Sequence, residues 1–196
     1  MNIMINRMTI RSFLAFPISS DLKESLGYIL NDLQQTRADV KWVRLENIHL
    51  TLKFLGDIEE IDLEKISSVL GESCCGFGPI TSHLSEIGIF PDLRHPRIVW
   101  AGLDDSKKKF QVLVEALEER LEKLGFAKDE HPFKPHITLG RVKSSANLKN
   151  LIQTIQQITF EGKNQHTFEK IILYKSTLTP QGPIYEVLKE FDIGRR

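Results

Sequence analysis

Two histidine–threonine pairs are the residues of this sequence best suited to chemistry. His49 and Thr51 lie two positions apart, and the same spacing recurs at His136 and Thr138. Each pair lies in a run that alternates apolar and polar residues, which is typical of a β-strand. Residues two apart on a strand point to the same face, so each run presents one imidazole and one hydroxyl to one side.

Two imidazoles suit a reaction that moves two protons. Histidine titrates near pH ~6.5, so close to neutrality one ring can be neutral while the other is charged. The neutral ring accepts a proton from water, and the charged ring donates one to a leaving oxygen. Phosphodiester opening fits this division, because the entering and leaving oxygens lie on opposite sides of phosphorus. The threonine hydroxyls can then hold the non-bridging oxygens.

A structural interpretation of these histidines must be weighed against the catalytic one. A single His-X-Thr on a strand is more often structural than functional. Two copies, each in an alternating strand that leads into a helix, are hard to obtain by chance, so we interpret both as functional. The sequence contains no HExxH, no CxxC and no clustered Asp–His pairs. We therefore expect neither a metal nor another cofactor.

Hydrophobic spacing predicts four amphipathic helices around these strands. The first begins after the capping residues Ser19-Ser20-Asp21, the second ends near Gly71, and the third ends at Gly125. The fourth carries its apolar stripe from Leu148 to Ile155. The strand-like runs are 9–16, 40–44, 48–55, 82–90, 97–103, 133–141, 167–174 and 184–191. Intermixed helices and adjacent strand pairs predict an α+β fold with antiparallel sheets.

The repeated motif predicts how these elements are organised. The segments 49–52 and 136–139 echo each other, and each is followed by a helix. We interpret this as two related, pseudo-symmetric lobes that face each other across a central cleft, with the helices outside. No linker separates them, so we expect one domain over residues 1–196. Strict alternation places Leu50, Leu52 and Phe54 in the core and Lys53 on the face of His49.

Composition limits the partners and the compartment. Lys plus Arg and Asp plus Glu both number 26, and this neutral balance argues against sequence-blind binding of long nucleic acids. No apolar run is long enough to span a bilayer, so we expect no membrane partner. Cys74 and Cys75 are adjacent and suit reduced thiols, and residues 1–8 lack the features of an export signal. We expect a cytoplasmic protein with no obligate protein partner.

The two motifs resemble those of a known superfamily. The segment 47–56 (NIHLTLKFLG) is similar to the first motif of the 2H phosphoesterases, and 134–141 (KPHITLGR) is similar to the second. Within that superfamily the chain resembles the RNA 2′,3′-cyclic phosphodiesterases, historically called 2′-5′ RNA ligases. Supporting segments are 11–16, 90–91, 96–102 and 182–185, so the resemblance covers roughly residues 11–191. The first eight residues precede the usual start of that family.

The resemblance implies an activity and assigns roles. Members of the family hydrolyse a terminal 2′,3′-cyclic phosphate on RNA to a 2′-phosphate without metal, and some join RNA halves through a reversible 2′-5′ bond. By this analogy the partner is an RNA 3′ end that bears a cyclic phosphate. His49 is then the proton donor to the departing 3′ oxygen, and His136 activates water. Alternatives are an enzyme for a small nucleotide-derived cyclic phosphate and a non-catalytic module that binds RNA ends.

Further residues are candidates for contacts with the substrate. Arg141 can hold the phosphate if a turn at Gly140 redirects it from the opposite face; otherwise it forms a surface salt bridge. Aromatic rings stack on the bases of single-stranded RNA, yet aromatic residues on strands more often pack into a core. The candidates for stacking are Phe13, Phe16, Trp42 and Tyr185.

Overall fold

The computed structural model describes residues 9–160 and 165–194, and within them the chain forms an α+β fold. The helices are α1 (Ser20–Gln35), α2 (Leu63–Cys74), α3 (Lys109–Glu122) and α4 (Leu148–Gln157), with short 3-10 turns η1 (Leu45–Asn47) and η2 (Glu60–Asp62). The strands are β1 (Thr9–Pro17), β2 (Val40–Trp42), β3 (His49–Glu59), β4 (Ile80–Ser82), β5 (Leu84–Phe90), β6 (Ile98–Leu103), β7 (His136–Val142), β8 (His166–Phe168), β9 (Lys170–Thr179) and β10 (Gly182–Asp192).

One large sheet carries most of these strands. Its order is β10-β9-β1-β3-β7-β6-β5, with β2 paired to β7, while β4 and β8 form a separate pair. All strand pairs found in residues 9–160 and 165–194 are antiparallel, which confirms the predicted fold class. The predicted strands 82–90 and 167–174 are each divided in two, because their first residues form the small sheet.

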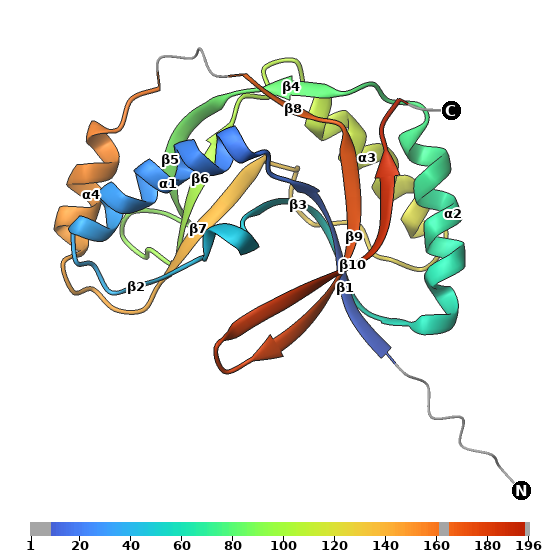
Figure 1. The fold of residues 1–196 in the computed structure, drawn as a ribbon, viewed down its shortest axis with the longest axis horizontal. Coiled ribbons are helices and arrows are strands. Elements are labelled where there is room, and N and C mark those ends of the chain that lie inside the picture. Colours follow the sequence, from blue (N-terminus) through green and yellow to red (C-terminus); the bar gives the residue numbers. More distant parts are fainter. Residues whose placement is uncertain (1–8, 161–164, 195–196) are drawn as a thin grey trace, which may run out of the picture.

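The β3–β7 junction divides the sheet into two similar sides. On each side the motif strand pairs with an earlier strand, β3 with β1 and β7 with β6; β9 and β10 lie beyond β1, and β5 lies beyond β6. The helices pair in an exchanged manner: α1 packs with α4, and α2 packs with α3 (Figure 1). The helix α1 follows β1, but it packs with the helix that follows β7. The helix α3 follows β6, but it packs with the helix that follows β3.

The helices form because their apolar stripes meet the sheet. Ser19 caps α1 by accepting a hydrogen bond from the Leu22 N–H at 3.3 Å, and Leu22, Leu26, Leu30 and Leu33 are buried. The helix α2 passes the expected end at Gly71, because its buried stripe continues to Cys74. At the end of α3, Gly125 takes a positive φ of 93°, so the predicted glycine terminus is confirmed to within a turn.

No helix within the described residues is both long and apolar enough to cross a membrane.

Candidate active site

A single register pair joins the two motif strands. Leu50 of β3 pairs with Ile137 of β7, and both side chains are fully buried. In an antiparallel pair, opposed residues share a face and their neighbours point to the other face. His49, Thr51, His136 and Thr138 therefore all project from the same side of the sheet. We call this side the histidine face.

The same register places the histidines diagonally across the junction. Around the Leu50–Ile137 pair, His49 lies toward Thr138, and His136 lies toward Thr51. Diagonal neighbours on paired strands have Cα atoms roughly 7–8 Å apart, and the strands themselves are about 4.8 Å apart. This spacing leaves room for a group the size of a phosphate between the imidazoles. Each ring then has a threonine hydroxyl from the opposite strand beside it.

Both imidazoles are held in the same way. The Nδ1 atom of His49 lies 2.8 Å from the Asn47 carbonyl oxygen, and Nδ1 of His136 lies 2.8 Å from the Lys134 carbonyl oxygen. A carbonyl only accepts, so Nδ1 of each ring carries the proton. The Nε2 atoms are thereby left for chemistry, as an acceptor in the neutral ring and as a donor in the charged ring.

Aromatic side chains support each imidazole. The ring centroid of His49 lies 4.8 Å from Phe13 and 5.2 Å from Tyr185, with Tyr174 at 6.3 Å. Phe13 pairs with Phe54 in the β1–β3 register, four positions from the Pro17–His49 pair. The rings of Phe13 and His49 therefore lean toward each other over the small side chains of Ala15 and Thr51, which lie between them in the register. These aromatic contacts limit how the His49 ring can rotate.

The second imidazole has an equivalent support. The His136 ring lies 5.1 Å from Phe90 and 6.2 Å from Trp100, measured between ring centroids. The indole of Trp100 lies directly over Gly88 of β5. A Cβ added at Gly88 would come within 2.2 Å of the indole, so only glycine leaves room for it there. The Lys134 ammonium lies 4.1 Å from the Trp100 centroid and 3.2 Å from a carboxylate oxygen of Glu86. A cation therefore lies beside His136.

Burial lowers the pKa of both histidines from the usual value of 6.5. The hydrogen bond to the Asn47 carbonyl opposes this effect at His49, and that to the Lys134 carbonyl opposes it at His136. The charge of Lys134 lowers the pKa of His136 further. Both rings are thus mainly neutral at pH 7 in the free protein. An anion bound between them would favour protonation of one ring.

Matching β-bulges alter the face of the residues that follow each motif. Thr51 and Lys53 pair with the consecutive residues Ala15 and Leu14, so Leu52 is an extra residue in β3. Likewise Thr138 and Gly140 of β7 pair with the consecutive residues Trp100 and Val99 of β6, so β7 has an extra residue at position 139. A bulge inserts one residue and reverses the alternation beyond it. The fifth residue after each histidine therefore returns to the histidine face.

These fifth residues are Phe54 and Arg141. The Phe54 ring lies 6.0 Å from Phe13, between centroids, and its side chain is 66% exposed. Arg141 is exposed, and its charge acts on the hydroxyl of Tyr185, beside His49. Burial raises the pKa of Tyr185, and the charges of Arg141 and Arg11 oppose that rise. One half thus contributes an aromatic ring and the other a guanidinium.

The bulges also correct three predictions made by strict alternation. Phe54 is exposed on the histidine face instead of filling the core, and Lys53 is buried on the opposite face with only 3% of its side chain exposed. Arg141 reaches the histidine face, and the cause is the extra residue at position 139 and not a turn at Gly140. Its contact with phosphate stays a prediction.

The aromatic candidates separate by burial and by face. Phe16 is fully buried against Phe110 and Phe168, so a base cannot stack on it and that prediction is wrong. Trp42 pairs with Gly140 and packs against the core, so it faces away from the histidines. Phe13 is 3% exposed and lies against His49, where it can orient the imidazole but offers no free ring face.

Tyr185 is partly exposed beside His49, and stacking on its ring stays a prediction. The sequence pattern placed Phe54 in the core and did not point to Tyr174, Lys134 or Trp100. The indole of Trp100 is buried and borders His136. Lys134 lies two residues before His136, as Asn47 lies two residues before His49. This matching position is the one feature of the sequence that could have indicated Lys134.

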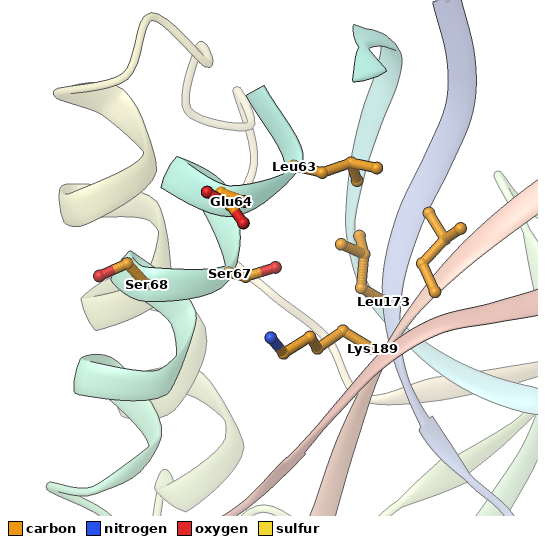
Figure 2. A pocket seen from close by; sticks show the side chains of 7 residues that line it. Leu63, Glu64, Ser67, Ser68, Leu173 and Lys189 are labelled. Carbon is orange, nitrogen blue, oxygen red and sulfur yellow. The ribbon is translucent and has the colours of Figure 1, made fainter. Parts of the chain in front are cut away.

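A pocket of about 440 Å³ lies elsewhere, between α2 and the β9–β10 strands (Figure 2). It is bordered by Leu63, Glu64, Ser67, Leu173 and Lys189. Leu173 is adjacent to Tyr174 on β9 and so points to the opposite side of the sheet. This pocket therefore does not contain the histidine pair. Among the described residues, no three His, Cys, Asp or Glu side chains cluster in a way that could hold a metal ion.

Two His–Thr pairs that project from adjacent strands of one antiparallel sheet define a 2H phosphoesterase. A family model described as LigT like Phosphoesterase matches residues 16–100 and 102–185. The chain belongs to this family of LigT-like phosphoesterases, and it is an enzyme of the phosphoesterase class.

Relatives agree with this assignment over nearly the whole chain. A protein named RNA 2′,3′-cyclic phosphodiesterase from Methanocaldococcus jannaschii is 36% identical over 92% of this chain and 99% of its own length. One of the same name from Methanothermobacter thermautotrophicus is 34% identical over 94% and 99%. The crystal structure of TT0787 of Thermus thermophilus has a TM-score of 0.79 at 27% identity, covering 94% of this chain and 98% of that one. E. coli LigT complexed with 3′-AMP shares the fold, with a TM-score of 0.74 at 22% identity over 96% and 100%.

Proposed function

We propose that this phosphoesterase hydrolyses the terminal 2′,3′-cyclic phosphate of RNA to a 2′-phosphate by acid–base catalysis between His49 and His136. The observation that carries the proposal is the Leu50–Ile137 register, which sets both imidazoles on one face of adjacent strands. The names of relatives that match almost full length support the substrate class.

The proposed step moves two protons across the phosphorus. His136 accepts a proton from water through Nε2, and the water oxygen attacks phosphorus. The bond from phosphorus to the 3′ oxygen breaks in line with the attack, and His49 gives its Nε2 proton to that oxygen. The Lys134 charge near His136 supports the choice of this ring as the base, because it disfavours the imidazolium.

The neighbouring side chains have supporting roles in this proposal. Thr51 and Thr138 donate hydrogen bonds to the non-bridging oxygens, and the guanidinium of Arg141 stabilises the charge that develops on them. Phe54 offers its exposed ring to the terminal base, and Tyr185 borders the same space from β10. The substrate is thereby placed with its base toward the β3 half and its phosphate toward Arg141.

An oligonucleotide that ends in a 2′,3′-cyclic phosphate tests the proposal directly. We expect conversion to a 2′-phosphate, with loss of at least about a hundredfold in kcat for His49→Ala or His136→Ala. EDTA should leave the rate unchanged, because neither proton transfer requires a metal. A 3′-phosphate product would mean that the bond from phosphorus to the 2′ oxygen breaks instead, which would contradict the proposed leaving group. Activity that EDTA removes and Zn²⁺ or Mn²⁺ restores would contradict the metal-free step.

A second candidate substrate is a small nucleotide-derived cyclic phosphate, such as ADP-ribose 1″,2″-cyclic phosphate. The neutral net charge favours it, because it indicates little affinity for a long polyanion. Comparison of kcat/KM for this compound and for the oligonucleotide separates the two. Reversible 2′-5′ joining of RNA halves would use the same proton transfers with a 5′-hydroxyl in place of water, and it is tested by supplying a 2′,3′-cyclic phosphate end with a 5′-hydroxyl end.

A further inference from the structure

Lys53 is a buried lysine of the first motif strand that takes no part in the proposed chemistry. Its side chain is 3% exposed and points away from the histidines, because the extra residue Leu52 reverses the alternation. Its ammonium binds the Glu118 carboxylate on α3 and lies 2.8 Å from Oδ1 of Asp129. Burial disfavours its charged form, but hydrogen bonds and charges from Asp129 and Glu118 outweigh this and raise the pKa of Lys53.

Asp129 lies midway along the segment 123–135 that joins α3 to the second motif. The Asp129 N–H also donates to Oε1 of Glu118 at 2.9 Å, so both the backbone and the side chain of this residue are held. Most of the segment is exposed and has no regular secondary structure. Near its end, the Pro135 carbonyl accepts a hydrogen bond from the Leu103 N–H at 3.2 Å. Phe126 and Phe133 also pack against the core, and Lys53 holds the exposed stretch that lies between them.

The end of this segment orients His136. The carbonyl of Lys134 accepts the hydrogen bond of Nδ1, and its position decides which nitrogen faces the substrate. The equivalent carbonyl before His49 belongs to Asn47, whose side-chain amide donates to the Pro183 carbonyl at 3.0 Å. The two imidazoles are therefore oriented by separately anchored segments. One of the contacts that hold the segment before His136 comes from Lys53, on the strand of the other motif.

We propose that Lys53 is a positioning residue for His136: through Asp129 it holds the segment whose Lys134 carbonyl fixes the imidazole. Apolar residues in place of all the charged partners could fill the space at least as well for stability, since complete buried ion pairs contribute little net stability. The ion pair instead specifies one conformation of an otherwise exposed segment. In the second half, the corresponding position is Gly140, which leaves space for Val40 and Trp42. Gly140 has no side chain that could form an equivalent ion pair, and the segment before His49 is held to β7 by the backbone instead, where the Val43 N–H donates to the Leu139 carbonyl at 2.8 Å.

The tautomer of each imidazole reports this role without any need for turnover. Long-range ¹H–¹⁵N correlation spectra at pH 8, where both rings are neutral, should show the Nδ1–H form for His49 and His136 in the unmodified protein. In Asp129→Asn, which retains the Lys53–Glu118 pair, and in Lys53→Met, we expect a mixture of tautomers at His136 alone. His49 serves as the internal control in the same spectrum.

Activity gives a second, independent measurement that rests on the proposed function. Both variants should lose about tenfold to a hundredfold in kcat with KM unchanged, since small misplacement of a catalytic group has effects of this size. Lys53→Arg should restore most of the rate. Lys128→Gln breaks an exposed 3.3 Å ion pair between the same segment and Glu122 at the end of α3, and it should change nothing.

The outcomes separate the inference from the proposed function. An unchanged His136 tautomer in folded Asp129→Asn protein, or an equal change at His49, would overturn the positioning role whatever the activity. A change confined to His136 in a protein that leaves cyclic phosphates intact would support the positioning role and refute the proposed substrate. If Lys53→Met does not fold, the Asp129→Asn spectrum decides the matter, because its carboxylate is 60% exposed and its loss leaves the buried pair.

Discussion

Replacement of Phe54 by alanine should weaken the use of substrates that carry a terminal base. The ring is 66% exposed on the histidine face, next to Phe13. Only about a third of it is covered, so its loss should cost at most about 1 kcal/mol of folding free energy. Stacking of a base on an aromatic side chain contributes about 1–3 kcal/mol, which corresponds to about 5-fold to 150-fold. The loss should appear in KM, because the stack is equal in the ground state and the transition state.

The assay compares two oligonucleotides that differ only in the terminal base. One ends in adenosine 2′,3′-cyclic phosphate and the other in the corresponding abasic ribose. Phe54→Ala should lower kcat/KM for the first and leave it unchanged for the second, while Phe54→Tyr should retain most of the activity. Tyr28→Ala is a matched control, since Tyr28 is 67% exposed on α1. Equal losses on both oligonucleotides, or no loss on either, would refute the assignment of Phe54 to the base.

The remaining predictions concern protonation and the coupling of the two halves. Because burial lowers the pKa of both His49 and His136, the singly protonated pair should be most abundant below pH ~6.5. A plot of kcat/KM against pH should therefore be bell-shaped with its maximum on the acid side of neutrality; a maximum above pH 7.5 would contradict this. His49→Ala and His136→Ala should be non-additive when combined, because the rings act in one step; a double variant whose loss equals the product of the single losses would indicate separate steps. Burial also lowers the pKa of His166, so its stabilising contribution should be complete above pH ~6.5 and decline as the pH falls, by at most about 1.4 kcal/mol per pH unit. Urea unfolding at pH 7.5 and 5.5 should show a smaller difference for His166→Leu than for the unmodified protein, and an equal difference would exclude this contribution.

The sequence predicted the elements of this fold because period and capping are local properties. The apolar stripe of α1 and its capping residue Ser19 lie close together in the sequence, so both can be recognised there, and the observed helix begins at Ser20. The alternation around each motif predicted which face the histidines and threonines share, and the register at Leu50 agrees. That a single continuous sheet joins the motifs is a matter of long-range pairing, which no local pattern specifies.

The errors arise at the bulges for a physical reason. A bulge depends on how two strands match in length and twist, so strict alternation along β3 alone cannot reveal the extra residue Leu52. Lys53 and Phe54, the two residues that follow it, were therefore assigned to the wrong faces. The prediction that Phe16 stacks on a base was wrong for a different reason. Phe16 is buried by Phe110 and Phe168, which lie far away in the sequence.

The two bulges also suggest how two similar halves would bind the asymmetric substrate of the proposed reaction. The histidines, threonines and carbonyl supports match in both halves, so they cannot by themselves decide which imidazole faces the leaving oxygen. The bulges bring one further residue from each half to the same face, and there the halves differ: Phe54 suits a base and Arg141 suits a phosphate. A nucleotide that satisfies both can bind in only one direction. The roles of donor and acceptor would then follow from the fifth residue after each histidine, and exchange of Phe54 and Arg141 should reverse the preferred direction while both imidazoles remain in place.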